Sequence, residues 1–373
     1  MSDPASHSVM LAAGGTGGHL FPAFALAQEL GRRGIAVDLV TDMRASQYDK
    51  GFPARAVYRV PSASVAGKSL MAAGKAALAL TRGIAASRKL LRTVKPSAVV
   101  GFGGYPAFPP LVAARLSGIP TAIHEQNAVL GRANRSLAGH VTAIATSFEN
   151  VKGLPARALA KVRLTGNPVR DQVVDWATQS YRPPRQGGPF SILVFGGSQG
   201  ARFFSDAMPE ALALMPVWMR ASLFVVQQCR EEDLERVDAA YAAAGIRAHL
   251  AAFFPNLPEE MAKAHLVLGR AGASTVAELT VMGRPSVLVP LPHAVDNDQL
   301  QNAMRLSDAG AAWCLEQKNY SPDFLAKALG ELLMSPETLA EAAAAAKAQG
   351  RPDAVTRLAD LVEELVGLRP RTA

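Results

Sequence analysis

The stretch SVMLAAGGTGGHLFPAFALAQEL, residues 8–30, joins an apolar run to a helical pattern through four glycines and a histidine. Residues 9–13 predict a short buried strand, and the apolar residues from Leu20 onward recur at helical spacing. Glycines at such a turn let the backbone approach another group closely, and the following helix offers unpaired N–H groups with a partial positive charge. The pattern therefore indicates a turn that binds phosphate, with a tight turn that holds no ligand as the alternative.

The spacing of these glycines departs from two nucleotide-binding fingerprints. A dinucleotide-binding loop that uses Gly15 and Gly17 would place a third glycine at position 20, where the chain has Leu20. A P-loop would need a lysine where His19 stands. An NAD-dependent oxidoreductase, with Asp42 at a strand end, therefore stays only as an alternative.

The same order of strand, glycine loop and helix recurs at SILVFGGSQGARFFSDAMPEAL, residues 191–212. A chain of 373 residues favours two domains, and the Pro- and Gly-rich residues 181–189 are typical of a linker. Other apolar runs alternate with helical patterns at residues 35–41, 97–102, 119–124, 141–146, 222–228, 247–253, 265–269 and 285–290. This alternation predicts an α/β protein with two Rossmann-like, doubly wound parallel-sheet domains that face one cleft. The Ala-rich residues 336–366 predict a helix that crosses back onto the first domain.

Positive charge is concentrated in one segment of a chain whose formal net charge is +8. From Lys50 to His124 there are eleven Lys and Arg and no Asp or Glu. Residues 69–95 of this segment predict a helix in which leucines alternate with cations, a pattern that suits a surface of anionic lipid headgroups. A solvated basic face is the alternative. We expect no nucleic-acid partner, because no aromatic platform or binding module accompanies the basic residues.

The cysteine count and the N-terminal composition indicate a cytosolic protein. Two cysteines do not form a disulfide framework in a chain of this size. No basic flank with an apolar core and a cleavage site occurs near the N-terminus, so secretion is not expected. Residues 96–114 contain no charged residue, but several prolines and a Gly-Phe-Gly-Gly kink argue against a transmembrane helix.

The sequence GRAGASTVAEL, residues 269–279, follows a predicted strand and supports two interpretations. In the first, Thr275 and Glu278 form a capping box that only begins a helix. In the second, the N–H groups of residues 273–276 bind a diphosphate and the Glu278 carboxylate binds two ribose hydroxyls. Both roles use the same helix N-terminus.

Four further motifs carry polar or glycine residues where ligands could bind. PLPHAVDNDQLQNA, residues 290–303, contains Asp296 and Asp298, but two carboxylates are a weak metal signal, so we expect a hydrogen-bonding surface for sugar hydroxyls and no metal. GFGGYPAFPP (101–110) and HEQNAVLGRANR (124–135) each end a predicted strand, at the same sheet edge as the first glycine loop. GNPVR (166–170) lies between the halves, where Arg170 could reach a phosphate.

Taken together, these motifs, with FGGSQGA near residue 198, resemble the MurG family, the UDP-N-acetylglucosamine transferases of peptidoglycan synthesis. The resemblance runs from Gly14 to Ala303 in the family's order. It implies a GT-B fold with an acceptor and membrane-associating domain (1–170), a UDP-sugar domain (171–348) and a C-terminal helix (349–373) on the first domain. It implies inverting transfer of GlcNAc from UDP-GlcNAc to the muramoyl 4-hydroxyl of undecaprenyl-diphosphate-linked muropeptide (lipid I), giving lipid II. The enzyme would act without a cofactor as a peripheral protein at the cytoplasmic face of the inner membrane, with other cell-wall synthesis proteins as candidate partners.

The resemblance also assigns site residues. His19 is the candidate catalytic base, with Glu125 as the second candidate, since a histidine whose pKa lies near neutrality suits removal of a hydroxyl proton. Asp298 departs from the residues usual in the family, which leaves its contact with the sugar open. The donor would be contacted by Thr16, Gly17, Gly18, Asn127, Arg170, Ser198, Phe254, Ala273, Ser274, Thr275, Val276, Ala277, Glu278 and Gln299.

Other functions remain as alternatives at the level of sequence. A UDP-GlcNAc epimerase or a lipid-A-type glycosyltransferase would reuse many of these loops, although the acid-free basic segment disfavours a soluble epimerase. A non-enzymatic adaptor on a membrane surface would explain the charge but not the motifs.

Overall fold

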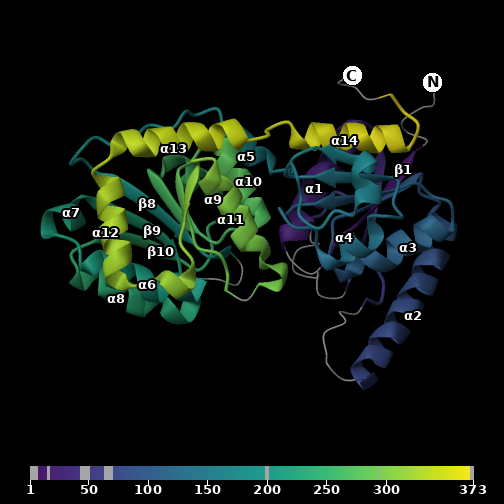
Figure 1. Cartoon of the computed structure of the whole chain (residues 1–373), viewed down its shortest axis with the longest axis horizontal. Coiled ribbons are helices and arrows are strands. Elements are labelled where there is room, and N and C mark those ends of the chain that lie inside the picture. The colour runs from purple at the N-terminus through teal and green to yellow at the C-terminus, as the bar shows by residue number, and fades with distance from the viewer. Residues whose placement is uncertain are drawn as a thin grey trace. The chain divides into compact units, whose positions relative to one another are not determined.

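The structure is a computed structural model that describes residues 7–14, 17–42, 51–62, 70–197, 201–292 and 294–369. Contacts between Cα atoms divide the chain into two compact units, Met1–Arg170 with Pro352–Ala373, and Asp171–Arg351. Each unit is a parallel sheet covered by helices, as predicted (Figure 1). The predicted linker, residues 181–189, lies inside the second unit, where the Tyr181 hydroxyl donates a hydrogen bond of 2.9 Å to the His265 carbonyl.

The first unit contains a seven-stranded sheet in the order β3-β2-β1-β4-β5-β6-β7. Every pair of neighbouring strands in it is parallel. The carboxyl ends of all seven strands therefore lie along one edge. The strands are β1 (Ser8–Ala12), β2 (Ala36–Thr41), β3 (Ala56–Arg59), β4 (Ala98–Gly101), β5 (Thr121–Glu125), β6 (Ala143–Thr146) and β7 (Val162–Leu164).

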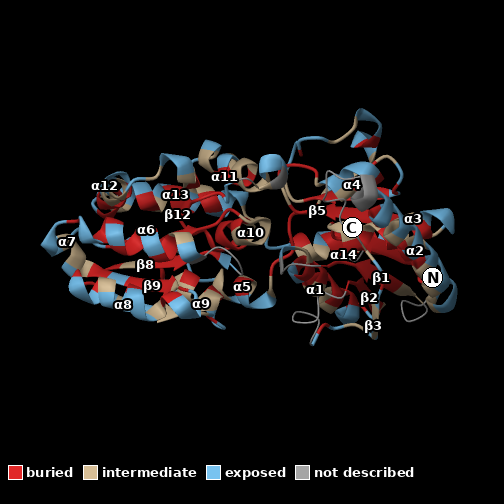
Figure 2. Ribbon diagram, turned by 90° about the horizontal axis from the view of Figure 1, so that it is seen from below, coloured by how far each residue is buried: buried red, intermediate tan, exposed pale blue. Residues whose placement is uncertain are grey.

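Alternate residues of the central strands face two separate cores of this unit. Val9 and Leu11 of β1 pack with α1 (Gly17–Arg32) and α14 (Ala354–Leu365). Met10 and Ala12 face the opposite side, with α2 (Leu70–Val94), α3 (Phe108–Leu116) and α4 (Arg132–Leu137). Burial on both faces explains why these strands read as continuous apolar runs. The buried strands and the exposed outer helix faces are visible in Figure 2.

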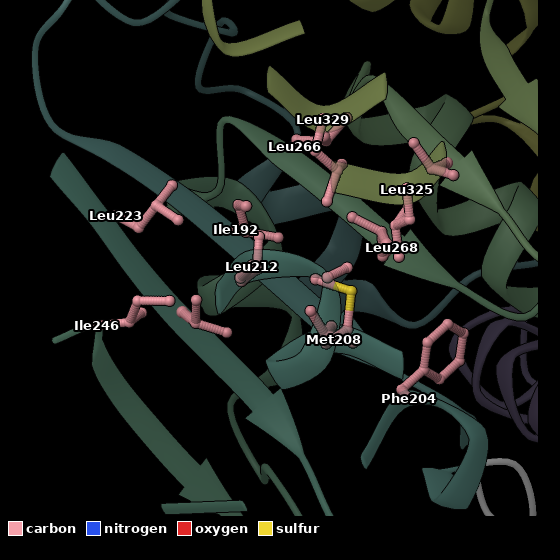
Figure 3. Close-up of a cluster of buried hydrophobic side chains, with 14 of the residues drawn as sticks. Ile192, Phe204, Met208, Leu212, Leu223, Ile246, Leu266, Leu268, Leu325 and Leu329 are labelled. Carbon is pink, nitrogen blue, oxygen red and sulfur yellow. The ribbon is translucent and has the colours of Figure 1, made fainter. Parts of the chain in front are cut away.

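The second unit contains a six-stranded parallel sheet in the order β10-β9-β8-β11-β12-β13. Side chains of α6, α8 and α12 pack on one face of this sheet and form the cluster in Figure 3. The strands are β8 (Phe190–Phe195), β9 (Leu223–Gln228), β10 (Arg247–Ala251), β11 (Leu266–Gly269), β12 (Ser286–Leu288) and β13 (Ala312–Cys314). The helices are α5 (Asp171–Trp176), α6 (Ala201–Ala213), α7 (Val217–Ser222), α8 (Leu234–Ala243), α9 (Leu257–Lys263), α10 (Ala273–Met282), α11 (Asp298–Asp308), α12 (Pro322–Leu333) and α13 (Pro336–Gln349).

The Ala-rich C-terminal segment forms two helices where the sequence predicts one. The break follows α13 at Gly350, whose Cα lies so close to α10 that an added Cβ would be 2.5 Å from the Thr280 carbonyl oxygen. Pro352 then prevents the chain from continuing the helix. The second helix, α14, packs beside α1 in the first unit (Figure 1).

Buried ion pairs join α14 to α1. The Arg33 side chain, only 3% exposed, donates hydrogen bonds to Glu29 at 2.8 Å, to Asp360 at 2.6 Å and to Glu363 at 2.7 Å. A fourth hydrogen bond of 3.2 Å reaches the Thr356 carbonyl. Since Glu363 is as deeply buried as Arg33, removing the guanidinium would leave a carboxylate without its compensating charge.

Replacing Arg33 with methionine should therefore lower the free energy of unfolding of the first unit by roughly 3–5 kcal/mol. Chemical denaturation followed by circular dichroism measures this change. The matched control is Arg32→Met, because the Arg32 side chain is 49% exposed and forms a surface ion pair with Glu29, so its loss should cost less than about 1 kcal/mol. Equal effects of the two substitutions would contradict the assignment.

Candidate functional site

Three loops of the first unit meet at the carboxyl edge of its sheet. They follow β1, β4 and β5, which are adjacent in the sheet order. A Cβ added to Gly14 would lie 2.5 Å from the Pro106 side chain, so the first loop packs directly on the second. Only a glycine allows this approach.

The His19 imidazole lies against two glycines of the second loop. Gly103 and Gly104 adopt φ angles of 84° and 72°, in the left-handed region that favours glycine. A Cβ at either position would be 3.3 Å from a ring carbon of His19. His19 itself is the third residue of α1, so the helix begins three residues earlier than the apolar pattern from Leu20 indicates.

The third loop supplies a polar contact to the same ring. His19 Nδ1 lies 3.2 Å from the side-chain oxygen of Gln126. The Gln126 amide nitrogen in turn lies 3.0 Å from the Phe102 carbonyl oxygen and 3.0 Å from His124 Nδ1. Sequence reasoning did not single out Gln126 or His124, although both belong to the quoted motif HEQN directly after β5.

Glu125, the second candidate base, has its carboxylate turned into the third loop. One oxygen accepts hydrogen bonds from the Asn127 N–H and side chain, and the other from the Gly131 N–H and the Asn134 side chain. Glu125 is 2% exposed. Its burial raises the pKa of the carboxyl group, although the hydrogen bonds from Gly131, Asn134 and Asn127 act in the opposite direction. These contacts suit a residue that holds the loop in place.

Arg170, at the end of the first unit, extends over the exposed ring of Phe21 in α1. The guanidinium carbon lies 5.6 Å from the ring centroid, a cation–π contact. Phe21 lies two residues after His19 in α1.

In the second unit, the predicted diphosphate site is the N-terminus of α10. The N-cap residue is Gly272, which provides no side-chain cap. The N–H groups of Ala273, Ser274 and Thr275 precede the first helical hydrogen bond, which Val276 donates to Gly272 at 3.0 Å. The buried Ser274 hydroxyl has no hydrogen-bond partner among the described residues.

The capping-box interpretation of this motif is wrong. A capping box would need Thr275 at the N-cap, but the structure places it as the third residue of α10. Glu278 lies in the helix interior and is 6% exposed, and so it does not cap the start of the helix.

The other predicted residues of this unit also lie at the carboxyl edge of its sheet. Phe254 follows β10 and packs edge-on against His249, with ring centroids 5.4 Å apart. Gln299, in the first turn of α11, accepts a hydrogen bond of 3.0 Å from the Leu291 N–H. Asp298 accepts a 2.8 Å hydrogen bond from the Gln299 N–H, which holds its carboxylate at the helix start. Thr16 and Ser198 lie outside the described residues, and Gly17 and Gly18 form the first turn of α1.

Arg270 is a residue of this edge that sequence reasoning missed. Its buried guanidinium donates hydrogen bonds of 3.2 Å to the Val289 and Pro290 carbonyls and to Gln317. It also lies over the rings of Phe203 and Phe204, and its burial lowers the pKa of the guanidinium. Arg270 therefore brings a positive charge close to the N-terminus of α10 and fixes the loop after β12.

Two domain models of one glycosyltransferase family match this chain, and its relatives carry one name. The glycosyltransferase family 28 N-terminal domain matches residues 9–146, and the family 28 C-terminal domain matches residues 191–358. A protein of Methylobacterium sp. (strain 4-46) is 53% identical over 95% of this chain and 96% of its own length. A protein of Paramagnetospirillum magneticum is 49% identical over 97% of both chains. Both are named UDP-N-acetylglucosamine–N-acetylmuramyl-(pentapeptide) pyrophosphoryl-undecaprenol N-acetylglucosamine transferase.

Among solved structures, MurG of Acinetobacter baumannii is similar over 96% of this chain and 99% of its own, with a TM-score of 0.79 and 30% identity. The chain belongs to the MurG family. Its fold is accordingly that of the GT-B glycosyltransferases, as predicted. A Listeria monocytogenes protein described as a UDP-N-acetylglucosamine 2-epimerase has a TM-score of 0.67 at 18% identity, over 97% of this chain and 98% of its own, which shows a shared fold alone.

Within the described part of this MurG-family chain, no helix combines the length and the apolar character needed to cross a membrane.

The buried His124 makes a pH-dependent contribution to stability. The pKa of His124 is lowered to about 4, and burial of the ring is the largest cause of this shift. The unfolded chain therefore binds a proton below the ordinary imidazole pKa of about 6.5, while the folded chain does not. Stability from this group is present above that pKa and is lost as the pH falls toward 4.

The free energy of unfolding should fall between pH 7 and pH 5 by about 2 kcal/mol more in the wild type than in His124→Gln. Urea denaturation at the two pH values measures the difference. His140→Gln is the matched control, because His140 is exposed and should leave the pH dependence of the wild type unchanged. The same slope in His124→Gln and in the wild type would show that His124 is not held neutral.

Proposed function

We propose that this chain transfers GlcNAc from UDP-GlcNAc to the muramoyl 4-hydroxyl of undecaprenyl-diphosphate-linked MurNAc-pentapeptide, converting lipid I to lipid II with inversion at the anomeric carbon. The observation that carries the proposal is the 53% identity with a relative of that name over almost the full length of both chains. The polar loops at the carboxyl edge of each sheet supply the groups that such a reaction needs.

In the proposed donor complex, the N-terminus of α10 binds the diphosphate through the N–H groups of residues 273–276. The N–H group of Ser198 and the guanidinium of Arg170 donate further hydrogen bonds to the diphosphate. Glu278 accepts hydrogen bonds from the ribose hydroxyls, and backbone groups at Phe254 bind the uracil. Gln299 and its neighbours contact the sugar, and Thr16, Gly17, Gly18 and Asn127 contact the donor from the first unit.

These contacts would favour the transition state over the ground state. Positive charge grows on the sugar ring as the glycosidic bond breaks, and negative charge grows on the departing UDP. Helix N–H groups and Arg170 stabilise that negative charge where it develops. The acceptor hydroxyl must also lose its proton during attack, and His19 is the proposed base, since the Glu125 carboxylate already accepts four hydrogen bonds from its own loop.

Replacing His19 with alanine should lower the turnover number by roughly 10²- to 10⁴-fold, the usual contribution of a general base. The affinity for UDP should change little, because His19 is proposed to act on the acceptor. The assay uses labelled UDP-GlcNAc with a short-chain lipid I analogue for turnover, and calorimetry for UDP binding.

The same assay separates the proposed reaction from its alternatives. Release of a free N-acetylhexosamine epimer, without disaccharide, would indicate an epimerase. Absence of any product from the wild type would contradict the transferase proposal.

We further propose that α2 binds the anionic surface of the inner membrane at its cytoplasmic face. The helix contains no acidic residue and packs against α3 along one side. Its other side exposes Lys75, Arg82, Lys89 and Arg92 together with Leu78, which is 51% exposed. Cations beside an exposed leucine suit phospholipid headgroups and the acyl boundary below them. The lipid acceptor would be reached from this surface.

Reversing the charges of Lys75, Arg82 and Lys89 to glutamate should lower partitioning onto phosphatidylglycerol vesicles by roughly 10²-fold, since each cation near such a surface contributes about 1 kcal/mol. Vesicle sedimentation measures the partitioning. The control reverses Arg182, Arg185 and Arg247, which are exposed cations of the second unit, and should reduce binding far less. A similar loss in both variants would show that net charge alone governs the association.

A further inference from the structure

A chain of hydrogen bonds runs from the His19 imidazole into the buried interior of the first unit. His19 Nδ1 lies 3.2 Å from Gln126 Oε1, and Gln126 Nε2 lies 3.0 Å from His124 Nδ1. His124 Nε2 lies 3.0 Å from the Gly166 carbonyl oxygen. The chain therefore links four residues from three segments of the unit, and each of its contacts is short enough for a hydrogen bond.

The Gly166 carbonyl at the far end determines which atom donates the proton in each of these hydrogen bonds. A carbonyl oxygen only accepts hydrogen bonds, so the contact with Gly166 requires that His124 carries its proton on Nε2. His124 is fully buried, and its burial lowers the imidazole pKa to about 4, so the ring is neutral near pH 7. A neutral imidazole with a proton on Nε2 has a lone pair on Nδ1, which must accept from Gln126.

The orientation of the Gln126 amide follows from three acceptors around its nitrogen. Besides His124 Nδ1 at 3.0 Å, these are the Phe102 carbonyl oxygen at 3.0 Å and the His124 carbonyl oxygen at 3.1 Å. An amide flipped by 180° would set its oxygen against two carbonyl oxygens. The Gln126 oxygen must therefore face His19, and an oxygen of this kind can only accept the Nδ1 proton.

We infer that Gln126 is a positioning residue that holds His19 in the tautomer protonated on Nδ1, so that Nε2 presents its lone pair to the acceptor hydroxyl. The inference deepens the proposed function and rests on it for the role of the base. The ring packs directly on Gly103 and Gly104, where an added Cβ would lie 3.3 Å from a ring carbon of His19. The hydrogen bond then selects which nitrogen is basic.

The neutral charge of Gln126 affects how strongly the protonated form of His19 is stabilised. A carboxylate in the position of Gln126 would hold the same tautomer but would also stabilise the imidazolium ion by its charge. The adjacent carboxylate, Glu125, accepts its hydrogen bonds from Asn127, Gly131 and Asn134. Gln126 therefore fixes the geometry of His19 without placing a negative charge beside the imidazole.

The direct test is the tautomer of His19 in the full chain without substrate. Nitrogen-15 NMR of histidine-labelled protein, recorded about two pH units above the ordinary imidazole pKa of about 6.5, distinguishes the two neutral tautomers. His19→Gln identifies the signal. We expect the Nδ1–H form for His19 and the Nε2–H form for His124. A His19 ring protonated on Nε2 in the wild type would overturn the inference even if every variant failed to fold.

Two substitutions then test whether Gln126 is the cause. Gln126→Leu removes the acceptor, so the His19 signal should shift toward the Nε2–H form, while the signal of the exposed His140 in the same spectrum stays unchanged. Gln126→Glu keeps an oxygen toward His19; its other oxygen, protonated where it faces the Phe102 and His124 carbonyl oxygens, replaces the amide donor, so this variant should restore the Nδ1–H form. An unchanged His19 tautomer in Gln126→Leu would mean that another group determines the tautomer, and it would overturn the inference.

Kinetics separate positioning from a structural role. Gln126→Leu should lower the turnover number by roughly 10- to 10²-fold, less than His19→Ala, and change the KM for UDP-GlcNAc by less than about twofold. Gln126→Glu should recover most of the turnover. A loss confined to KM would overturn the inference. Because NMR needs no substrate, a predicted tautomer in a protein that forms no disaccharide would refute the proposed function alone.

Discussion

Parallel pairing of every strand in each sheet is the constraint on which the candidate site depends. When neighbouring strands run in one direction, all of their strand-to-helix loops open at the same edge. In the first unit this brings together the loops after β1, β4 and β5, which are far apart in the sequence and adjacent in the sheet. In the second unit it gathers Phe254, the start of α10 and Gln299 at one edge. The chemistry of each unit therefore follows from its topology before any side chain is considered.

Close packing between loops then determines which residues that edge can accept. Gly14 lies against Pro106, and Gly103 and Gly104 lie against the His19 ring. A larger side chain at these positions would separate the first two loops and move the imidazole away from Gln126. Gly103 and Gly104 belong to the motif GFGGYPAFPP, which the sequence marks only as a loop where ligands could bind; their packing against the proposed base is a role that no sequence fingerprint indicates.

The sequence predicts the central strands of both described sheets and the edge strand β10, but it misses the other three edge strands. Central strands such as β1 and β11 are buried on both faces and form continuous apolar runs. The strands that escape prediction, β3, β7 and β13, are three or four residues long, lie at sheet edges and are only partly buried. The start of α1 is also missed, because Gly17 and Gly18 carry no apolar side chain that could reveal a helical period. Membership of the MurG family is confirmed by the relatives, whereas the roles of the individual site residues remain predictions.

The contrast between Glu125 and Gln126 shows why residue type alone could not identify the side chain that contacts His19. The two side chains are adjacent in sequence at the end of β5, where successive residues point to opposite sides of the strand. Glu125 consequently meets the donors of its own loop and is buried among them, and Gln126 meets His19. A carboxylate is the usual partner of a histidine base, so the sequence HEQN suggests Glu125 as the partner of His19, yet the alternation of the strand gives this contact to Gln126. Because this depends on strand register and loop conformation, it becomes visible only in the folded chain.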